Sequence, residues 1–362
     1  MDQDQKWMRV ALKQAELGLG RTAPNPCVGA VIVKNGELVG KGYHRKAGGP
    51  HAEVEAIRDA GEAAIGATCL VTLEPCCFHG RTPACTDALI RAGVSRVVFA
   101  VRDPNPKVAG RGSQILQEAG IEVKAGVCEE DAAFLNRHFF HFIQEKTPFV
   151  TWKYAMTADG KIATHTGESK WITGVEARKE VQHLRFISDA ILVGAGTVRA
   201  DNPALTLRLE GEPKELLRVI LDDRKGLGPN FEVFQSGETR PTMLFSNFDY
   251  CSSDLQSFNK QGVEVVSSPG PHELRAILET LARRDIVHLM VEGGSQVLGS
   301  FLAERLVQEI WAFIGSKLIG GQAAPGPVGG LGVSDLSDAM KLSPFETRQS
   351  GLDVLVKYTV GG

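Results

Sequence analysis

Three short motifs in the first hundred residues carry residue types that bind zinc. His51-Ala52-Glu53 is followed by Glu74-Pro75-Cys76 and then by Cys85. A catalytic zinc ion needs three protein ligands and one open position for water, and one imidazole with two thiolates meets that need. Zinc lowers the pKa of its bound water, so hydroxide is available near neutral pH. The pattern therefore predicts a catalytic zinc site with His51, Cys76 and Cys85 as ligands.

Glu53 follows the histidine by two residues, so we expect its carboxylate to lie beside the metal. In hydrolytic deamination a glutamate takes the proton of the water and passes it to the leaving amine, and the spacing here follows the H-x-E and P-C pattern of zinc deaminases. Glu53 is therefore the predicted proton shuttle. His51 and Cys76 each follow a proline, and we expect each to open a helix whose positive N-terminus favours the thiolate.

The spacing of the two cysteines departs from the usual C-x-x-C of these deaminases. An insert from Cys77 to Ala84 separates Cys76 from Cys85 and brings His79 and Arg81 to the expected mouth of the site. A longer loop that carries a cation favours a phosphorylated substrate. Cys77 is an alternative ligand, although adjacent helical residues point to different faces.

Composition narrows the class of protein. The 362 residues are 43% hydrophobic and 23% charged, with a formal net charge of -3, which is ordinary for a globular protein. Cationic and anionic residues nearly balance within 1–147, which argues against a nucleic-acid partner. The acidic N-terminus does not resemble a signal peptide, and no apolar run approaches the roughly 18 residues of a membrane span. We expect a cytoplasmic protein without a membrane partner.

The length exceeds one ordinary core, so we expect two domains, 1–147 and 148–362, that meet at Thr147-Pro148. In the first, short apolar strands alternate with helical segments, which predicts a three-layer α/β/α sandwich. Asn35-Gly36 is the expected turn of a hairpin. The expected strands are Val28–Val33, Glu37–Tyr43, Thr68–Leu73, Arg96–Val101 and Ile121–Val123. The expected helices begin near Met8, His51, Pro83 and Gln114, and residues 128–146 are expected to be a helical, partly aromatic segment.

The second domain is strand-rich, with helical stretches between several strands. Gly293 and Gly294 follow one strand and precede a helix, and Ala190–Gly196 ends in a similar glycine turn. Such turns bring backbone N–H groups close to a phosphate, which favours a dinucleotide across both. Gly320–Gly330 is expected to be a mobile loop. The expected strands are Phe149–Met156, Ala190–Val193, Arg218–Leu221, Thr242–Phe245, Val263–Val266, Val287–Val291 and Glu309–Ile314.

Several longer stretches resemble the bifunctional deaminase–reductase family of bacterial riboflavin biosynthesis. They are TAPNPCVGAVIV, GYHRKAGGPHAEVEA, VTLEPCCFHGRTPACTDAL, DPNPKVAGRG, KYAMTADGKIA, GESKWIT, GAGTVRADNPALTLR and VEGG, and together they extend over nearly the whole chain. The resemblance implies a cytidine-deaminase-like N-terminal domain and a dihydrofolate-reductase-like α/β C-terminal domain. It also implies Zn2+ and NADPH as cofactors.

The implied reactions are two consecutive steps on a phosphorylated pyrimidine. The first is hydrolysis of the ring amine of 2,5-diamino-6-(5-phosphoribosylamino)pyrimidin-4-one, which gives 5-amino-6-(5-phosphoribosylamino)uracil and ammonia. The second is NADPH reduction of the ribosyl unit to ribityl. By the same resemblance, the residues that contact the deaminase substrate are Asn25, His44, His79 and Arg81.

The resemblance also assigns reductase residues. Those implied for NADPH are Ala155, Trp171, Thr197, Asp201, Asp223, Gly294, Ser295, Gln296, Val297, Leu298, Gly299 and Ser300. Those implied for the ribosyl-phosphate substrate are Ser169, Arg185, Leu205, Arg208 and Glu292. A guanidinium pairs bidentately with phosphate, which suits the two arginines.

Two features of the reductase half stay open on sequence alone. Glu292 and Lys153 are the titratable candidates for the reduction, since no acid–base pair stands out. Arg199 or Arg224 would suit the 2′-phosphate that distinguishes NADPH from NADH.

Two other functions compete with this interpretation. One is a zinc deaminase of nucleotides or tRNA bases with an unrelated C-terminal module, which predicts a basic groove and short cysteine spacing. The other is a binding scaffold with structural zinc, which normally has four protein ligands. We also expect a homo-oligomer, with the aromatic segment 134–143 buried at a domain or subunit interface.

Overall fold

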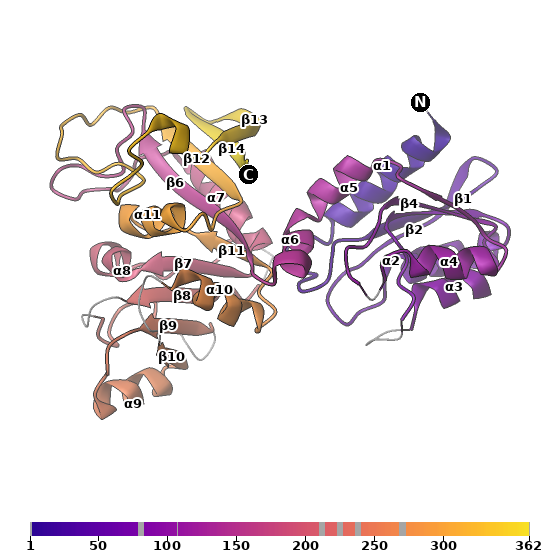
Figure 1. Cartoon of the computed structure of the whole chain (residues 1–362), viewed down its shortest axis with the longest axis horizontal. Helices are drawn as coiled ribbons and strands as arrows, with labels where there is room; N and C mark the ends of the chain where they lie inside the picture. The colour runs from indigo at the N-terminus through magenta and orange to yellow at the C-terminus, as the bar shows by residue number, and fades with distance from the viewer. Residues whose placement is uncertain are drawn as a thin grey trace. The chain divides into compact units, whose positions relative to one another are not determined.

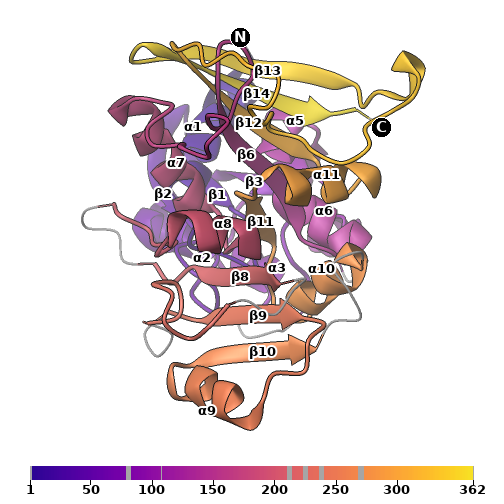
Figure 2. The same cartoon turned by 90° about the vertical axis from the view of Figure 1, so that its left-hand side faces the viewer.

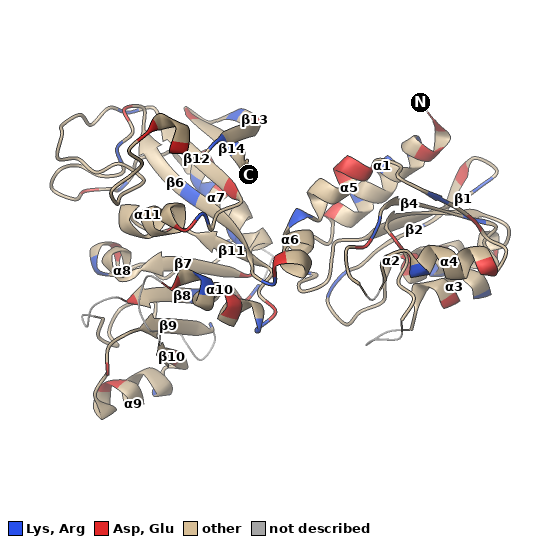
Figure 3. Ribbon diagram, viewed as in Figure 1, with Lys and Arg blue, Asp and Glu red and all other residues tan. Residues whose placement is uncertain are grey.

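The computed structural model describes residues 2–78, 83–106, 108–209, 214–222, 227–235, 240–267 and 273–361. The chain divides into two compact units, Met1–Lys146 and Thr147–Gly362, each with its own sheet and core (Figure 1). Lys and Arg are interspersed with Asp and Glu along the elements of both units (Figure 3). Among the described residues, no helix is long and apolar enough to cross a membrane.

Unit 1 is built on a five-stranded sheet in the order β2-β1-β3-β4-β5. The strand β1 is antiparallel to both of its neighbours, while β3, β4 and β5 run parallel. The strands are β1 Gly29–Lys34, β2 Glu37–Tyr43, β3 Thr68–Leu73, β4 Arg96–Val101 and β5 Glu122–Ala125. The helices are α1 Gln3–Glu16, α2 Ala52–Ala60, α3 Cys85–Arg91, α4 Arg111–Glu118, α5 Glu129–Leu135 and α6 Arg137–Glu145, with a 3-10 turn, η1, over Gly61–Ala64.

Helices cover both faces of this sheet. Apolar residues of α2, α3 and α4 pack on one face in a buried cluster, and those of α1 and α5 pack on the other. The predicted α/β/α sandwich is confirmed. The predicted hairpin turn is also present, with Asn35 and Gly36 at φ 52° and 81°, the left-handed conformation that suits these two residue types.

The segment 128–146 is helical, as expected, and it consists of two helices, α5 and α6. At the break between them the side chain of Asn136 bonds to the backbone N–H and carbonyl of Cys27, at 2.8 and 2.9 Å. One expectation for unit 1 was wrong in detail. Cys76 does not open a helix. It lies in the irregular segment after β3, and the next helix, α3, starts at Cys85.

Unit 2 contains a nine-stranded sheet in the order β10-β9-β8-β7-β11-β6-β12-β14-β13. Figure 2 shows one end of this order, with β10, β9 and β8 in succession. The strands from β10 to β12 are parallel, and β14 and β13 are antiparallel. The strands are β6 Phe149–Thr157, β7 Ala190–Gly194, β8 Leu217–Asp222, β9 Thr242–Ser246, β10 Val263–Ser267, β11 His288–Val291, β12 Glu309–Gly315, β13 Leu342–Ser350 and β14 Asp353–Val360.

Helices again form two layers around this sheet. Buried residues of α7, α8 and α9 belong to one apolar cluster, and those of α10 and α11 belong to another. The helices are α7 Val175–Ile187, α8 Ala195–Asp201, α9 Ser252–Lys260, α10 Leu274–Ala282 and α11 Ser295–Ala303, with a 3-10 turn, η2, over Leu336–Asp338. The sheet therefore has the α/β architecture expected of this half of the chain.

The predicted loop Gly320–Gly330 is present, and it is bonded to its surroundings at several points. Gly320 N–H donates to the Asp159 carboxylate at 2.6 Å, and Gly329 N–H donates to the carbonyl of Ser295 at 2.8 Å. The loop is thereby attached to the turn after β6 and to the start of α11.

Candidate active sites

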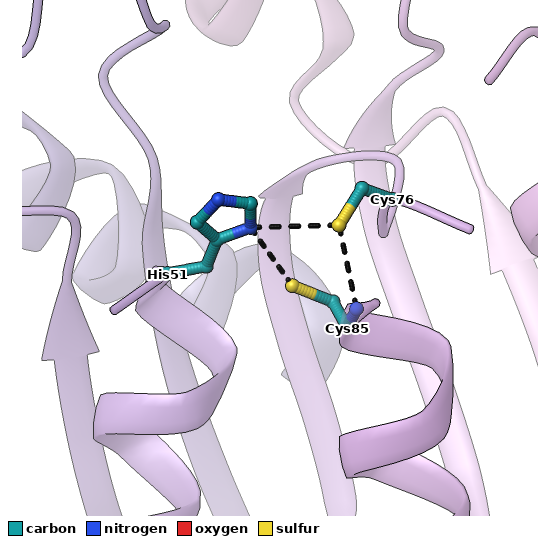
Figure 4. A group of neighbouring side chains, drawn as sticks. All are labelled: His51, Cys76 and Cys85. Carbon is teal, nitrogen blue, oxygen red and sulfur yellow. Dashed lines mark hydrogen bonds between the residues drawn. The ribbon is translucent and has the colours of Figure 1, made fainter. Parts of the chain in front are cut away.

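The three predicted zinc ligands converge in unit 1. His51 Nδ1 lies 3.1 Å from Cys85 Sγ and 3.5 Å from Cys76 Sγ, as Figure 4 shows. All three donor atoms lie within 4.8 Å of one another. Zinc bonds of roughly 2.0–2.3 Å in a tetrahedron put donor atoms about 3.5 Å apart, so this donor set fits a zinc ion. Among the described residues the donor group has three members, which is the number of protein ligands that a catalytic zinc ion takes.

Three different elements supply these side chains. His51 caps the N-terminus of α2 in extended conformation, and Cys85 is the first residue of α3. Cys76 comes from the segment after β3, where its sulfur accepts a bond from the Cys85 N–H at 3.3 Å. The positive end of α3 therefore faces the sulfur of Cys76, although Cys76 itself is not helical.

The two thiols are electrostatically linked. The thiol of Cys85 donates a hydrogen bond to the sulfur of Cys76, and His51 makes a second hydrogen bond to it. Together these bonds outweigh the effect of burial and lower the pKa of Cys76 to about 4. The same bond, together with burial, raises the pKa of Cys85 well above the ordinary value. A negative charge is thus already favoured on Cys76, as a metal ligand requires.

Glu53 lies in the first turn of α2, next to the sulfurs, and is only 3% exposed. Burial is the main cause that raises the pKa of its carboxyl group, and the nearby Cys76 adds to the rise. A carboxyl group whose pKa is raised toward the working pH is better suited to proton transfer than an ordinary glutamate, which fits a proton shuttle.

Asn25 and His44 form a second polar pair beside the zinc ligands. Asn25 Nδ2 lies 3.0 Å from His44 Nε2, and His44 Nδ1 lies 2.9 Å from the carbonyl of Pro50. The His44 ring meets the His51 ring edge-on at 5.4 Å. Burial lowers the pKa of His44, so the neutral ring donates from Nδ1 to Pro50 and accepts from Asn25. This pair holds the amide of Asn25 in a fixed orientation.

Four residues named in the sequence analysis lie outside the described residues: His79, Arg81, Asp223 and Arg224. Cys77 is described, but within the described part of the chain the three-residue donor group does not include it.

Glu74 had no predicted role of its own, yet its carboxylate accepts three hydrogen bonds from described residues of unit 1. It accepts from the N–H of Gly110 at 3.1 Å, from the N–H of Ser113 at 3.2 Å and from the Ser113 hydroxyl at 3.1 Å. Glu74 is 2% exposed. The signal available in the sequence was a carboxylate just before a ligand cysteine.

In unit 2 the two predicted glycine turns lie side by side. β7 runs into α8 through Gly194, and β11 runs into α11 through Gly293 and Gly294. A Cβ atom on Gly194 or Gly293 would lie 2.7 Å from the side chain of Val297, so glycine is needed for both turns to pack around it. The N-termini of α8 and α11 therefore meet at one edge of the parallel sheet, where phosphates commonly bind.

A charged triad lies close to these turns. Lys153 Nζ donates to Glu292 Oε1 at 2.7 Å, and Arg185 Nη2 donates to Glu292 Oε2 at 2.8 Å. Desolvation favours the neutral form of Glu292, but the two cations outweigh it and lower its pKa to about 2. Arg185 also donates to the carbonyl of Thr206 at 2.8 Å, so its guanidinium is engaged within the protein.

The other residues implied for the reductase occupy varied positions. The Ser169 hydroxyl and the Lys170 ammonium both contact the carboxylate of Asp201, each at 3.5 Å. Trp171 is 60% exposed and stacks with Arg178 at 4.5 Å. Arg208 is exposed, whereas Leu205 is buried. Ala155 lies on β6 and Thr197 on α8, and the oxygen of Thr197 faces Gly294.

The stretch implied for NADPH over 294–300 opens α11. Leu298 and Gly299 are buried, and the Leu298 side chain belongs to the apolar core. Ser295, Gln296, Val297 and Ser300 are partly or fully exposed. Contacts from the buried pair to a ligand would therefore come from the backbone.

Comparison with known proteins matches each unit to a family. Residues 1–101 match the cytidine and deoxycytidylate deaminase zinc-binding region, and residues 148–356 match the RibD C-terminal domain. The riboflavin biosynthesis protein RibD of Actinobacillus pleuropneumoniae is 44% identical, with 99% of this chain and 95% of that protein aligned.

Two solved structures are similar to this chain over nearly its whole length. Acinetobacter baumannii RibD superposes with a TM-score of 0.90 at 39% identity, covering 99% of both chains. A Thermotoga maritima protein, named as a diaminohydroxyphosphoribosylaminopyrimidine deaminase/5-amino-6-(5-phosphoribosylamino)uracil reductase, has a TM-score of 0.88 at 40% identity, again over 99% of both chains.

The fold, the donor set and these matches define a zinc-type deaminase joined to a reductase in one chain. The chain belongs to the RibD family of riboflavin biosynthesis proteins. The predicted family, its two enzyme classes and its cofactors, zinc and NADPH, are confirmed at this level. The match over 148–356 argues against a nucleic-acid deaminase with an unrelated C-terminal module.

Proposed function

We propose that unit 1 hydrolyses the ring amine of 2,5-diamino-6-(5-phosphoribosylamino)pyrimidin-4-one and that unit 2 reduces the ribosyl unit of the product with NADPH. The observation that carries this proposal is the His51, Cys76 and Cys85 donor set with a buried Glu53 beside it. The name of the Thermotoga maritima relative describes the same pair of reactions.

His51, Cys76 and Cys85 are the proposed ligands of zinc, which, when bound, supplies a water molecule of lowered pKa. In the reaction the carbon–nitrogen bond to the ring amine breaks, a carbonyl forms at the same carbon, and ammonia leaves. Glu53 takes one proton from the attacking water and delivers it to the departing nitrogen, and the other proton of the water ends on the adjacent ring nitrogen as the carbonyl forms. Its raised pKa and its burial support this shuttle.

Asn25 and His44 are the proposed contacts to the pyrimidine ring. Because the Asn25 amide N–H donates to His44, the Asn25 carbonyl oxygen is oriented to accept from a ring or amine N–H. His79 and Arg81, from the insert between the cysteines, are the proposed contacts to the phosphorylated side chain. These assignments rest on the family motif and on the proximity of the motif to the ligands.

In unit 2 the paired turns at Gly194 and Gly293 are the proposed cradle for the phosphates of NADPH, which supplies the hydride. The hydride is added at C1′ of the ribosyl unit, the ring C–O bond opens, and the ring oxygen takes a proton. Lys153, held by Glu292, is the candidate proton donor. Ser169, Arg185, Leu205, Arg208 and Glu292 are the proposed substrate contacts, and Arg185 also holds Glu292.

The remaining NADPH contacts are proposed over a wider surface. They comprise Ala155, Trp171, Thr197, Asp201, Asp223 and the residues from Gly294 to Ser300. Arg199 on α8 is the proposed partner of the 2′-phosphate, since its guanidinium is oriented by the buried Asp222 at 3.5 Å. Tyr250 in turn donates to Asp222 at 2.6 Å.

We also propose that the domains divide the activities at 147/148, that the partner is a small molecule rather than nucleic acid, and that the chain acts in the cytoplasm as a homo-oligomer. The interspersed charges of Figure 3 support a small-molecule partner. Thiolate ligands are best kept in a reducing compartment. Phe134, 43% exposed on α5, supports burial of the aromatic segment by another surface.

A coupled assay tests the proposal. Purified protein of known zinc content receives the diaminopyrimidine phosphoriboside alone and then with NADPH, while ammonia and nicotinamide absorbance are followed. Ammonia release without NADPH, followed by equimolar NADPH oxidation, is expected. Ammonia release with no oxidation of NADPH would overturn the proposed reductase activity. If protein with one zinc bound neither releases ammonia nor oxidises NADPH, the proposed substrate is wrong.

A further inference from the structure

Glu74 connects the segment that carries Cys76 to the start of a separate helix. Its carboxylate receives the N–H of Gly110, the N-cap residue of α4, and both the N–H and the hydroxyl of Ser113 in the first turn. Its own N–H donates to the carbonyl of Val101 on β4 at 3.0 Å. Glu74 is therefore bonded to the end of one strand and to the beginning of one helix.

These bonds satisfy groups that α4 cannot satisfy by itself. The first N–H groups of a helix lack intrahelical partners and are normally bonded by a capping side chain from the preceding residue. Here the N-cap is Gly110, which has no side chain, and no local side-chain cap forms. Glu74 supplies the cap from a distance of 36 residues in sequence, and its negative charge lies at the positive end of the helix dipole.

The residue after Glu74, Pro75, also lies close to α4. A Cβ atom on Gly112, in the first turn of α4, would lie 2.1 Å from the carbonyl oxygen of Pro75. Only glycine permits this approach. Glu74 and Pro75 are thus both held against α4, and the next residue is Cys76. On its other side Cys76 is bonded to α3 through the N–H of Thr86, which donates to its carbonyl at 3.2 Å.

We propose that Glu74 is a positioning residue for Cys76, and that its cap of α4 sets how firmly the zinc ion is held. Without the cap, the segment after β3 has no regular secondary structure to fix it, because Cys76 lies outside any helix or strand. Glu74 acts through the backbone that carries the ligand and touches neither the metal nor the substrate. The inference rests on the proposed zinc site.

A role confined to the stability of α4 is the alternative. It predicts a lower melting temperature for unit 1 with unchanged metal retention in the folded protein. The positioning role predicts faster loss of zinc from folded protein, under conditions where the fold is intact. The rate of zinc release to an excess of a chromogenic chelator, measured well below the melting temperature, separates the two.

Three variants and one control test the positioning role in the full-length protein. Glu74→Gln turns one oxygen into an amide nitrogen that faces an N–H donor. Gly112→Ala places a methyl group against Pro75. Ser113→Ala removes one of the three bonds and leaves the rest. Glu118→Gln, an exposed glutamate on the last turn of the same helix, is the matched control.

For Glu74→Gln, zinc release is expected to be roughly tenfold faster than in the unmodified protein, in the range of losses seen when groups supporting metal ligands are changed. Gly112→Ala is expected to show at least the same effect, and Ser113→Ala a smaller one. The deaminase kcat should fall while the KM for its substrate stays near its original value. NADPH oxidation on the already deaminated substrate should be unchanged, which shows that unit 2 is folded.

Zinc release at the unmodified rate in folded Glu74→Gln would overturn the positioning role. If Glu74→Gln does not fold, Ser113→Ala decides: release faster than in Glu118→Gln supports the role, and equal release overturns it. Absence of zinc from the unmodified protein would instead overturn the proposed zinc site, so the two failures are distinguishable.

Discussion

The two candidate sites are organised differently. In unit 1, the proposed zinc ligands and the proposed proton shuttle come from short motifs, and the donor atoms of His51, Cys76 and Cys85 lie within 4.8 Å of one another. In unit 2, the residues implied for the reductase are spread over β6, α7, α8, the turn after β11 and α11, and some are linked by ion pairs such as Lys153–Glu292. A metal site needs few residues in strict geometry, whereas a dinucleotide and a sugar phosphate need a long surface.

This contrast has an electrostatic side. In the unit 1 site two pKa values are shifted: burial raises that of Glu53, and hydrogen bonds from Cys85 and His51 lower that of Cys76 to about 4. The unit 2 site fixes its charges, because Lys153 and Arg185 keep Glu292 ionised, with a pKa of about 2. The first arrangement suits proton transfer during hydrolysis, and the second suits orientation of a substrate for a cofactor that carries the chemistry.

Removal of zinc should have the largest effect, and it should affect the site of unit 1 without affecting the site of unit 2. Dialysis against a chelator is expected to abolish ammonia release completely, because no activated water remains, and added zinc should restore it. NADPH oxidation on the deaminated substrate should stay within about twofold of the untreated rate. Loss of both activities together would contradict the independence of the two sites.

Changes to the charged triad should affect only the reductase. Lys153→Gln is expected to lower the rate of NADPH oxidation roughly 100-fold, the usual contribution of a positioned proton donor, with ammonia release unchanged. Lys341→Gln, at an exposed lysine of unit 2, is the matched control. An unchanged oxidation rate in Lys153→Gln would remove Lys153 from the proposed mechanism.

A change at Arg199 tests whether unit 2 distinguishes NADPH from NADH. Arg199→Ala is expected to raise the KM for NADPH roughly tenfold, since a charge-assisted bond to phosphate is lost, and to leave the KM for NADH unchanged. Arg275→Ala, on the exposed face of α10, serves as the control. Equal changes for the two nucleotides would show that Arg199 does not read the 2′-phosphate.

The smallest expected effect concerns stability rather than activity. Arg96 and Lys124 lower the pKa of Asp4 to about 2, so the ionised carboxylate stabilises the folded state. Because the folded pKa is depressed, this contribution is present above about pH 4 and is lost as the pH falls through 2. Asp4→Asn should lower the free energy of unfolding by about 1 kcal/mol at pH 7, after allowance for solvent screening.

Denaturant unfolding of the original protein and Asp4→Asn, at pH 7 and near pH 2, measures this term. The difference between the two proteins should shrink toward zero at the acidic end. A difference that does not depend on pH would mean that packing, and not the charge of Asp4, stabilises the helix α1.

The zinc donor set could be predicted because its residue types are rare and its spacing is chemically constrained. The proximity of His51, Cys76 and Cys85 followed from the motif alone. The local backbone at Cys76 could not be predicted in this way. Pro75 resembles the first residue of a helix, but the segment is held instead by the long-range hydrogen bond between the Glu74 carboxylate and the N–H of Gly110, the N-cap residue of α4. No local pattern reports a cap that comes from 36 residues away.

The C-terminal hairpin was missed for a related reason. β13 and β14 pair through residues 342–360, but β13 is largely exposed and polar, so it lacks the apolar alternation that marks a strand. Its stability comes from partners elsewhere, such as Glu180, which pairs with Arg348. For Arg185, the contact to a phosphate stays a prediction, and the sequence alone did not indicate its further bonds to Glu292 and to the carbonyl of Thr206.

The most direct test of the central claim is Glu53→Gln, with three quantities measured on one preparation. Ammonia release should fall by roughly 10²–10⁴-fold, because the proton shuttle is lost, while one zinc per chain and the full rate of NADPH oxidation on the deaminated substrate are kept. Undiminished ammonia release would contradict the assignment of Glu53 as the shuttle. Loss of zinc would make Glu53 a ligand, and loss of NADPH oxidation would show that the two sites are not separate.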